Sequence, residues 1–279
     1  MPWIDLEGTA NTRDLGGLPT ENGGKTVAGR LLRSDNLQEL TSADIARLTG
    51  ELGLSTVVDL RSTAERHSEG AGPLDEVPSV TRRHHPVLPE EGLATDAVAD
   101  VLLTRNEQDR SRYPGNAMTG HYLGYLEDRP DQVVAALRSV ARASGAVMVN
   151  CAAGKDRTGV VVGLALSVAG VQPDAIAADY AATGERTEPL LARLRRSATY
   201  ADDINRRPPE AHRPQAATMT AFLAELQSRY GGAVAWLTAH GLSQDDQDLL
   251  RAKLRDPGEP GEPGEPGEPG DPGKPGDLE

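Results

Sequence analysis

The most constraining feature of the chain is residues 146–170, where a short apolar run, a turn and a longer apolar run follow one another directly. The first run, Ala146–Asn150, is rich in valine and has the length of a buried strand. The second run begins at Gly159 and keeps apolar residues at helical spacing. The only cysteine, Cys151, stands where the strand enters the turn. A strand that passes through a tight turn into a helix is typical of α/β folds.

Other segments favour the same class of fold. Thr41 and Asp44 have the spacing of a capping box, which predicts a helix from there to about Gly53. Strands that alternate with helices indicate a central, mainly parallel sheet of four to five strands, flanked by helices and followed by a helical C-terminal segment. The cysteine strand is expected at the centre of this sheet. Strands are predicted at 31–32, 55–60, 80–87 and 146–150, and helices at 94–105, 116–127, 130–144, 159–169, 173–183, 187–198 and 215–254.

The turn after Cys151 has the composition of an anion-binding loop. A free thiol has a pKa of about 8.5, and only its thiolate is a strong nucleophile. Unpaired N–H groups at a helix start stabilise an anion, and Gly154 permits a backbone that a side chain would obstruct. Arg157 adds a permanently charged, fork-shaped donor, and Thr158 is placed to donate to the sulfur. The alternative is a buried structural cysteine at a strand end. The residues expected to bind the anion are Ala152, Ala153, Gly154, Lys155, Asp156 and Arg157.

Four stretches together resemble the bacterial tyrosine-phosphatase family, over roughly residues 3–255. Cys151–Gly159 is similar to its active-site pattern His-Cys-x-x-Gly-Lys-Asp-Arg-Thr-Gly. Asn11–Gly17 is similar to its Asn-x-Arg-Asp-x-Gly-Gly signature, Val57–Arg61 to its strand ending in Asp-Leu-Arg, and Phe222–Leu254 to its C-terminal helices. One position departs from the pattern, because Asn150 stands where the family has histidine. An asparagine can hydrogen-bond but cannot carry a charge.

The resemblance implies a protein-tyrosine-phosphatase, a phosphoric monoester hydrolase that uses no cofactor. Its substrates would be phosphorylated proteins, with phosphotyrosine and in some members phosphoserine, phosphothreonine or phosphoinositides as the reacting group. Cys151 would form a cysteinyl-phosphate intermediate while Arg157 and the loop hold the phosphate oxygens. The alternative is a catalytically weak phosphate-binding module, a pseudophosphatase, which Asn150 favours.

The proton donor to the leaving group has two candidates. Asp156 lies inside the loop, and the family resemblance points to the same position; a carboxylate that shapes the loop through Lys155 or Arg157 is the alternative. Asp59 follows a predicted strand, where α/β sheets gather ligands, but it is also placed to pair with a neighbouring arginine. Two residues of the N-terminal signature, Arg13 and Asp14, are expected to brace the loop.

Residues 88–128 have a mixed polar pattern that fits either a lid over the site or a surface insertion. Among their tyrosines, Tyr113, Tyr122 and Tyr125 could line a substrate entrance, although core packing is the alternative for the last two. The adjacent His84 and His85 do not predict a metal site, because neighbouring side chains on a strand face opposite sides.

Composition sets the remaining limits. The net charge is −13, to which residues 257–279 contribute seven acids and one lysine, so that −7 remains for residues 1–256. Neither part has the basic surface of a nucleic-acid-binding protein. The single cysteine excludes an internal disulfide and fits a reducing compartment. No apolar run is long enough for a membrane span and no signal peptide is evident, so a cytoplasmic location is expected, with other export routes left open.

The last segment repeats Gly-Glu-Pro and related triplets, which have the glycine period of collagen. Because its acidic triplets repel one another and few repeats are present, a disordered tail over 257–279 is the favoured interpretation and a collagen-like trimer the alternative. Residues 1–256 are then expected to form one phosphatase domain. The sequence does not define the oligomeric state.

Overall fold

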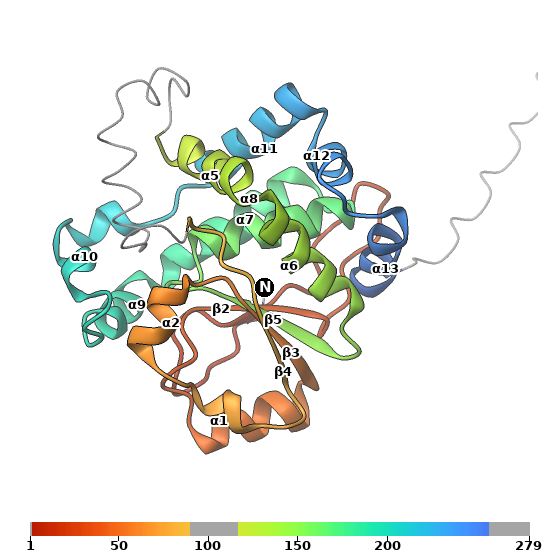
Figure 1. Cartoon of the computed structure of the whole chain (residues 1–279). Helices are drawn as coiled ribbons and strands as arrows, with labels where there is room; N and C mark the ends of the chain where they lie inside the picture. Colours follow the sequence, from red (N-terminus) through yellow and green to blue (C-terminus); the bar gives the residue numbers. More distant parts are fainter. Residues whose placement is uncertain (1, 90–116, 257–279) are drawn as a thin grey trace, which may run out of the picture.

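A mixed β-sheet occupies the centre of the computed structural model, which describes residues 2–89 and 117–256 (Figure 1). Within those residues the sheet has five strands in the order β1-β2-β5-β3-β4, and β5 is the central strand. The neighbouring strands β2, β5, β3 and β4 all run parallel, whereas β1 is antiparallel to β2. The predicted α/β class and the central position of the cysteine strand are therefore confirmed. The strands are β1 (Arg13–Asp14), β2 (Leu31–Ser34), β3 (Leu54–Asp59), β4 (Thr81–His84) and β5 (Ala146–Asn150).

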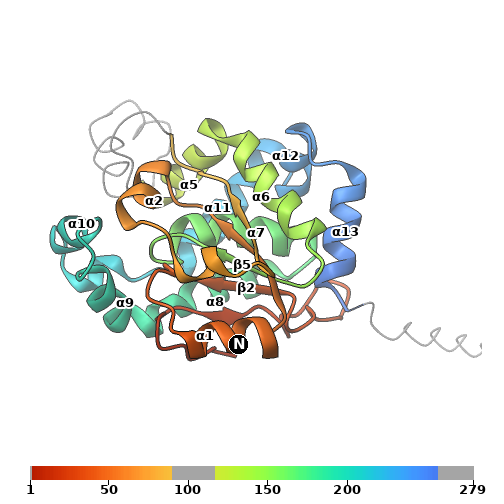
Figure 2. The same ribbon diagram turned by 60° about the horizontal axis from the view of Figure 1, so that its bottom comes forward.

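The sheet is covered by helices on both faces, and the alternation of side chains along β5 shows how. Val147 and Val149 belong to the larger core cluster, together with residues of the helices above the sheet in Figures 1 and 2. Met148 points the other way and packs in a smaller cluster with Leu48 and Leu74. Because both faces are buried, β5 is apolar at every position before Asn150, as expected for a central parallel strand.

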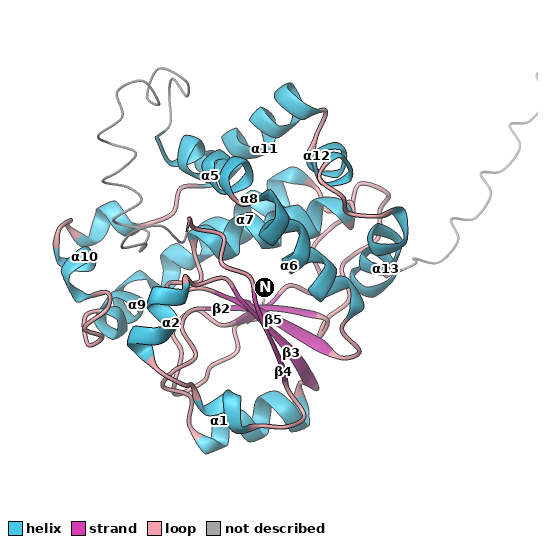
Figure 3. Ribbon diagram, viewed as in Figure 1, coloured by secondary structure: helices cyan, strands magenta, loops and turns pink. Residues whose placement is uncertain are grey.

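The helices are shown in cyan in Figure 3 and surround the sheet. The described α-helices are α1 (Ser42–Ala46), α2 (Thr63–Glu69), α5 (Ala117–Asp128), α6 (Pro130–Arg142), α7 (Asp156–Val168), α8 (Pro173–Ala182), α9 (Thr187–Leu194), α10 (Ala201–Asn205), α11 (Ala216–Tyr230), α12 (Ala233–Ala239) and α13 (Gln244–Leu254). Shorter 3₁₀ segments are Pro73–Glu76, Thr183–Arg186 and Pro209–His212. No helix in the described part of the chain combines the length and apolarity that a bilayer crossing requires.

Element boundaries differ from the predictions where local signals were weak. The capping box of Thr41 and Asp44 is present, but the helix changes to a π-helical turn at Arg47–Glu51. The fourth strand ends at His84 rather than at 87, and the two-residue β1 and helix α2 were not predicted. The helical run 215–254 is divided into three helices at glycines with positive φ. The predicted helix at 94–105 and the tail at 257–279 lie outside the described residues.

The C-terminal helix α13 is fixed to α6 by one buried carboxylate. Asp246 accepts a hydrogen bond from Arg138 Nε at 3.1 Å and one from Arg142 Nε at 2.7 Å. Its backbone N–H and its Oδ2 also bond Ser243, which caps the helix. Asp246 thus joins the helix cap to the neighbouring helix, although both arginines keep much of their surface in water.

We expect Asp246→Ala to lower the free energy of unfolding by about 1.5–3 kcal/mol, the usual effect of losing hydrogen bonds to a charged group. Urea denaturation followed by circular dichroism measures this change. The control is Asp245→Ala, because Asp245 precedes it in the same helical turn and is exposed. Equal stability of the two variants would contradict the assignment.

Candidate active site

The loop that leaves β5 turns sharply at Gly154 before α7 begins at Asp156. Gly154 has a φ of +64°, and a Cβ placed on it would lie 2.4 Å from the carbonyl oxygen of Ser34. The loop backbone therefore lies directly against the end of β2, with no space for a side chain. This close approach is the physical reason for glycine at the third position after Cys151.

Two side chains from the N-terminal part of the chain hold the loop from outside. Asn11 Nδ2 donates to the carbonyls of Ala153 at 2.9 Å and Gly154 at 3.2 Å. Arg33, on β2, donates through an NH2 group to Gly154 O at 2.7 Å. These bonds occupy the carbonyl groups of Ala153 and Gly154 with side-chain donors from outside the loop.

The flanking carbonyls are bonded as well, one to the segment after β2 and one within the first turn of α7. Ala152 O accepts from the backbone N–H of Asn36 at 2.9 Å, and Lys155 O accepts from that of Gly159 at 2.8 Å. The backbone N–H groups of residues 152–155 donate to no acceptor in the described part of the chain. A loop whose carbonyls are occupied on the outside and whose N–H groups are unpaired is suited to bind an anion.

A buried ion-pair cluster supports Asn11 and Arg33. Asp179, on α8, accepts from Arg13 Nε at 2.8 Å and also pairs with Arg33. Arg13 in turn donates to Asn11 Oδ1 at 2.5 Å. Burial alone would raise the pKa of Asp179, but the two guanidinium groups outweigh it and lower that pKa. The predicted bracing by Arg13 therefore acts through Asn11, whereas Asp14 instead accepts from two backbone N–H groups near the first turn.

Arg157 is oriented by a carboxylate that the sequence analysis did not identify. Its NH1 donates to Glu65 Oε2 at 2.6 Å and its NH2 to Glu65 Oε1 at 2.9 Å, and both side chains are buried. Glu65 also accepts from the N–H of Ser62 at 2.7 Å in the capping box of α2. The Ser-x-x-Glu spacing was the available signal, but it indicates a helix start rather than an arginine partner.

Cys151 lies beneath this loop with 0% of its surface exposed. Its side chain belongs to the large core cluster, so the thiol is not accessible in this arrangement. The hydroxyl of Thr158 is buried and makes no hydrogen bond within the described residues, the Cys151 sulfur included. The bond expected from Thr158 to the sulfur is therefore not formed in this structure. Asn150 is buried as well, and neither its amide nitrogen nor its amide oxygen has a partner in that part of the chain.

The two candidate proton donors lie in different surroundings. Asp156 borders the cavity beside the loop and is 7% exposed, with Lys155 Nζ 3.4 Å from its Oδ2. Burial would raise the pKa of Asp156, but Lys155 and a hydrogen bond from Tyr122 lower it. Asp59 is not among the cavity residues and accepts from Arg61 at 3.0 and 2.7 Å. Asp59 is thus placed as the partner of a neighbouring arginine, the alternative recognised from the sequence.

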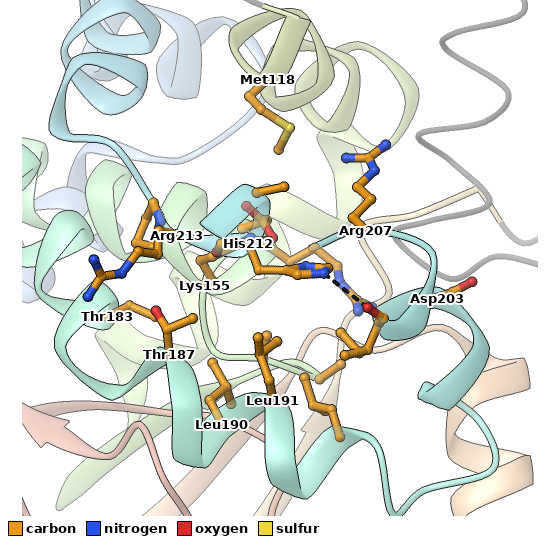
Figure 4. A pocket seen from close by; sticks show the side chains of 18 of the residues that line it. Met118, Lys155, Thr183, Thr187, Leu190, Leu191, Asp203, Arg207, His212 and Arg213 are labelled. Atoms are coloured by element: carbon orange, nitrogen blue, oxygen red, sulfur yellow. Dashed lines mark hydrogen bonds and ion pairs between the residues drawn. The ribbon is translucent and has the colours of Figure 1, made fainter. Parts of the chain in front are cut away.

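A cavity of about 280 Å³ opens over the loop (Figure 4). We call it the loop cavity; its floor is formed by Ala152, Ala153, Lys155, Asp156 and Arg157. Leu190 and Leu191 of α9 form an apolar wall on one side, and Met118 lies on the opposite side. Lys155 Nζ donates to the carbonyl of His212 at 3.1 Å, which connects the loop to the 3₁₀ segment Pro209–His212. The floor is therefore polar and the walls partly apolar.

The structure describes two of the three tyrosines predicted near the entrance. Tyr122 and Tyr125, on α5, are almost fully buried in the large core cluster, as expected for core packing. Tyr113 lies outside the described residues. His84 and His85 bond different groups, Arg61 O and Ser139 Oγ respectively.

Comparison with known proteins places the chain in a family. The model of the tyrosine phosphatase family matches residues 4–256, so the chain belongs to that family. It is 35% identical over 193 residues to a putative tyrosine-protein phosphatase of Cupriavidus necator, which covers 66% of each chain. It is 34% identical over 142 residues to a tyrosine-protein phosphatase of Nostoc commune, over 49% of this chain and 48% of the relative.

A third relative is the triple specificity protein phosphatase PtpB of Mycobacterium tuberculosis. The identity is 32% over 209 residues, which cover 68% of this chain and 72% of the relative. The chain thus matches between about half and three quarters of the length of these relatives.

We expect Gly154→Ala to weaken binding of inorganic phosphate about tenfold or more, because the new methyl group displaces the loop from Ser34. Isothermal titration calorimetry measures the affinity. Gly170→Ala is the matched control: Gly170 also has a positive φ, of +75°, but a Cβ there meets no atom within 4 Å. Both variants introduce backbone strain, so equal phosphate affinities would contradict the role of the close approach.

Proposed function

We propose that the chain is a cysteine-dependent phosphatase that hydrolyses phosphate monoesters, with phosphotyrosine as the first candidate substrate. The observation that carries the proposal is the loop after Cys151, whose carbonyls already accept hydrogen bonds, while the N–H groups of residues 152–155 donate to no acceptor among the described residues. Arg157 at the end of this loop adds a guanidinium already oriented by Glu65. Phosphoryl transfer depends mainly on such positioning and charge stabilisation.

The reaction has two steps. In the first, the Cys151 thiolate attacks phosphorus, the S–P bond forms and the bond to the leaving oxygen breaks, while that oxygen takes a proton from Asp156. In the second, water attacks phosphorus, the S–P bond breaks and the Asp156 carboxylate accepts a proton from the water. Arg157 and the loop N–H groups hold the non-bridging oxygens through both steps. The thiolate and the protonated Asp156 are thereby restored.

The closed arrangement requires that substrate entry be accompanied by movement. Ala152 packs with Leu190, Leu194 and Tyr200 in a small apolar cluster next to the loop. Because Cys151 has no exposed surface, phosphorus reaches the sulfur only when residues around the loop shift. Movement of α9, which carries the two leucines, is the simplest such change.

A phosphate-binding module without turnover is the second candidate function. The burial of Cys151 and the Asn150 amide, which has no partner among the described residues, favour it, since Asn150 cannot supply the charge that a histidine would. Such a module would bind phosphate through the same loop but would not release alcohol or phenol from an ester.

Turnover of p-nitrophenyl phosphate in the presence of a metal chelator separates the two functions. We expect the wild type to be active and Cys151→Ser to lose about 10⁴-fold or more in kcat, the order of loss when a nucleophile is removed. Phosphate binding, measured by calorimetry, is expected to persist in Cys151→Ser. Phosphate binding without turnover in the wild type would instead support the binding module.

Lys155 provides a test of substrate class. It lies on the floor of the loop cavity, and Arg207 and Arg213 border the same cavity, so highly charged phosphoinositide headgroups are candidate substrates beside phosphotyrosine. We expect Lys155→Ala to lower kcat/KM more for a soluble phosphoinositide than for a phosphotyrosine peptide, because more negative charge lies near the lysine. Equal losses on the two substrates would remove the argument for inositides.

A further inference from the structure

Asp156 is held by a chain of two buried phenols that the mechanism above does not use. The hydroxyl of Tyr122, on α5, bonds Asp156 Oδ1, and the hydroxyl of Tyr180, on α8, lies 2.6 Å from that of Tyr122. All three side chains are almost fully buried. The carboxylate at the start of α7 is therefore bonded directly to α5 and, through the Tyr122 hydroxyl, connected to α8.

The donor direction along this chain follows from chemistry. An ionised carboxylate only accepts hydrogen bonds, so Tyr122 donates to Asp156 and its oxygen is then free to accept from Tyr180. Burial is the largest cause that raises the pKa of Tyr122 and of Tyr180. Both phenols therefore stay protonated and remain donors. Hydrogen-bond donation thus runs in one direction, from Tyr180 to Tyr122 and from Tyr122 to Asp156.

Gly159 supplies independent support, because the last glycine of the active-site pattern makes room for one of these phenols. A Cβ on Gly159 would lie 2.9 Å from Cδ2 and 3.3 Å from Cε2 of Tyr180. The ring of Tyr180 therefore packs directly on the backbone of α7, within one turn of Asp156. The position of this ring provides a physical reason for glycine inside an otherwise apolar helix.

The remaining groups that face Asp156 are cationic or ionisable. Lys155 Nζ is 3.4 Å from Oδ2, and His121, which borders the same cavity, also favours the ionised carboxylate. Tyr122 occupies Oδ1 and leaves Oδ2 on the side of Lys155. The two carboxylate oxygens are thus distinguished by their partners.

We propose that Tyr122 and Tyr180 are positioning residues for proton transfer: they fix Oδ1 of Asp156 and leave Oδ2 to exchange the proton with the leaving group and then with water. This inference rests on the proposed function, in which Asp156 is the proton donor. Gly159 contributes to this arrangement because it allows the close packing that sets the position of the Tyr180 ring.

The pH dependence of the reaction distinguishes a role of Tyr122 in proton transfer from a purely structural role. Tyr122→Phe removes a donor to the ionised carboxylate, so the pKa of Asp156 rises. Activity is lost with rising pH when the proton donor ionises, so this basic limb of the kcat/KM profile moves to higher pH in Tyr122→Phe. Loss of alignment lowers kcat about tenfold, a part of the 10²–10⁴-fold that general acid catalysis typically contributes.

The experiment compares two esters that differ in their need for a proton. Phenyl phosphate has a poor leaving group, whereas p-nitrophenyl phosphate expels a stabilised phenolate. The kcat loss in Tyr122→Phe and Tyr180→Phe is expected to be larger for phenyl phosphate, with KM little changed. Tyr230→Phe is the control, because Tyr230 lies on α11 and is bonded to none of the three groups. Gly159→Ala should reproduce the effect of Tyr180→Phe, whereas equal losses on the two esters, or an unmoved basic limb, would overturn the proposal.

A second measurement does not depend on turnover. Carbon-13 NMR of labelled aspartate gives the pKa of Asp156 directly, with Asp156→Asn used to assign its signal. An increase of this pKa in Tyr122→Phe supports the hydrogen-bonded chain even if the wild type proves to be only a binding module, and an unchanged pKa rejects it. If Tyr122→Phe does not fold, Tyr180→Phe gives the same comparison with a smaller expected increase.

Discussion

The buried carboxylate of Asp179 is the interaction on which the loop depends. It pairs with Arg13 and Arg33, two guanidinium groups that would be very costly to bury alone. With two positive charges and one negative charge, this cluster keeps one net positive charge next to the loop. Asn11 and Arg33 transmit the arrangement to the backbone through the carbonyls of Ala153 and Gly154. The cluster thus shapes the loop and makes its surroundings favourable for an anion before any substrate is present.

Strand order explains why the supports converge on the loop. Strands β2 and β3 flank β5 in parallel, so the residues after all three strands meet at one edge of the sheet. The end of β2 provides the backbone that contacts Gly154, and the segment after β3 provides Glu65, which orients Arg157. The loop is held on one side and its arginine on the other, and both supports belong to the same sheet edge.

The local parts of this site were predictable, whereas the long-range partners were not. Strand β5, the turn at Gly154 and the start of α7 follow from a continuous pattern of residue types. Glu65 and Asp179 are separated from their arginine partners by 92 and 146 or more residues, and many acidic residues could have filled either role. The pairing of Asp59 with Arg61 was more accessible, since only two positions separate them. Strand β1 has two residues and no hydrophobic periodicity, so only its partner β2 defines it.

In the proposed mechanism, the protonation of Asp156 connects the electrostatics of the site to its chemistry. Lys155 and Tyr122 favour the ionised carboxylate despite its burial, which suits acceptance of a proton from water in the second step. Donation in the first step requires the opposite state. A phosphate dianion bound beside the carboxylate disfavours a further negative charge and raises the pKa of Asp156. Substrate binding would therefore be coupled to proton uptake. Transfer of the phosphoryl group to Cys151 would then remove the thiolate charge, since the phosphoryl group is a dianion on sulfur as it was on oxygen. In the proposed mechanism the same carboxylate acts as donor and acceptor because the negative charge around it changes between the two steps, while Tyr122 keeps its position constant.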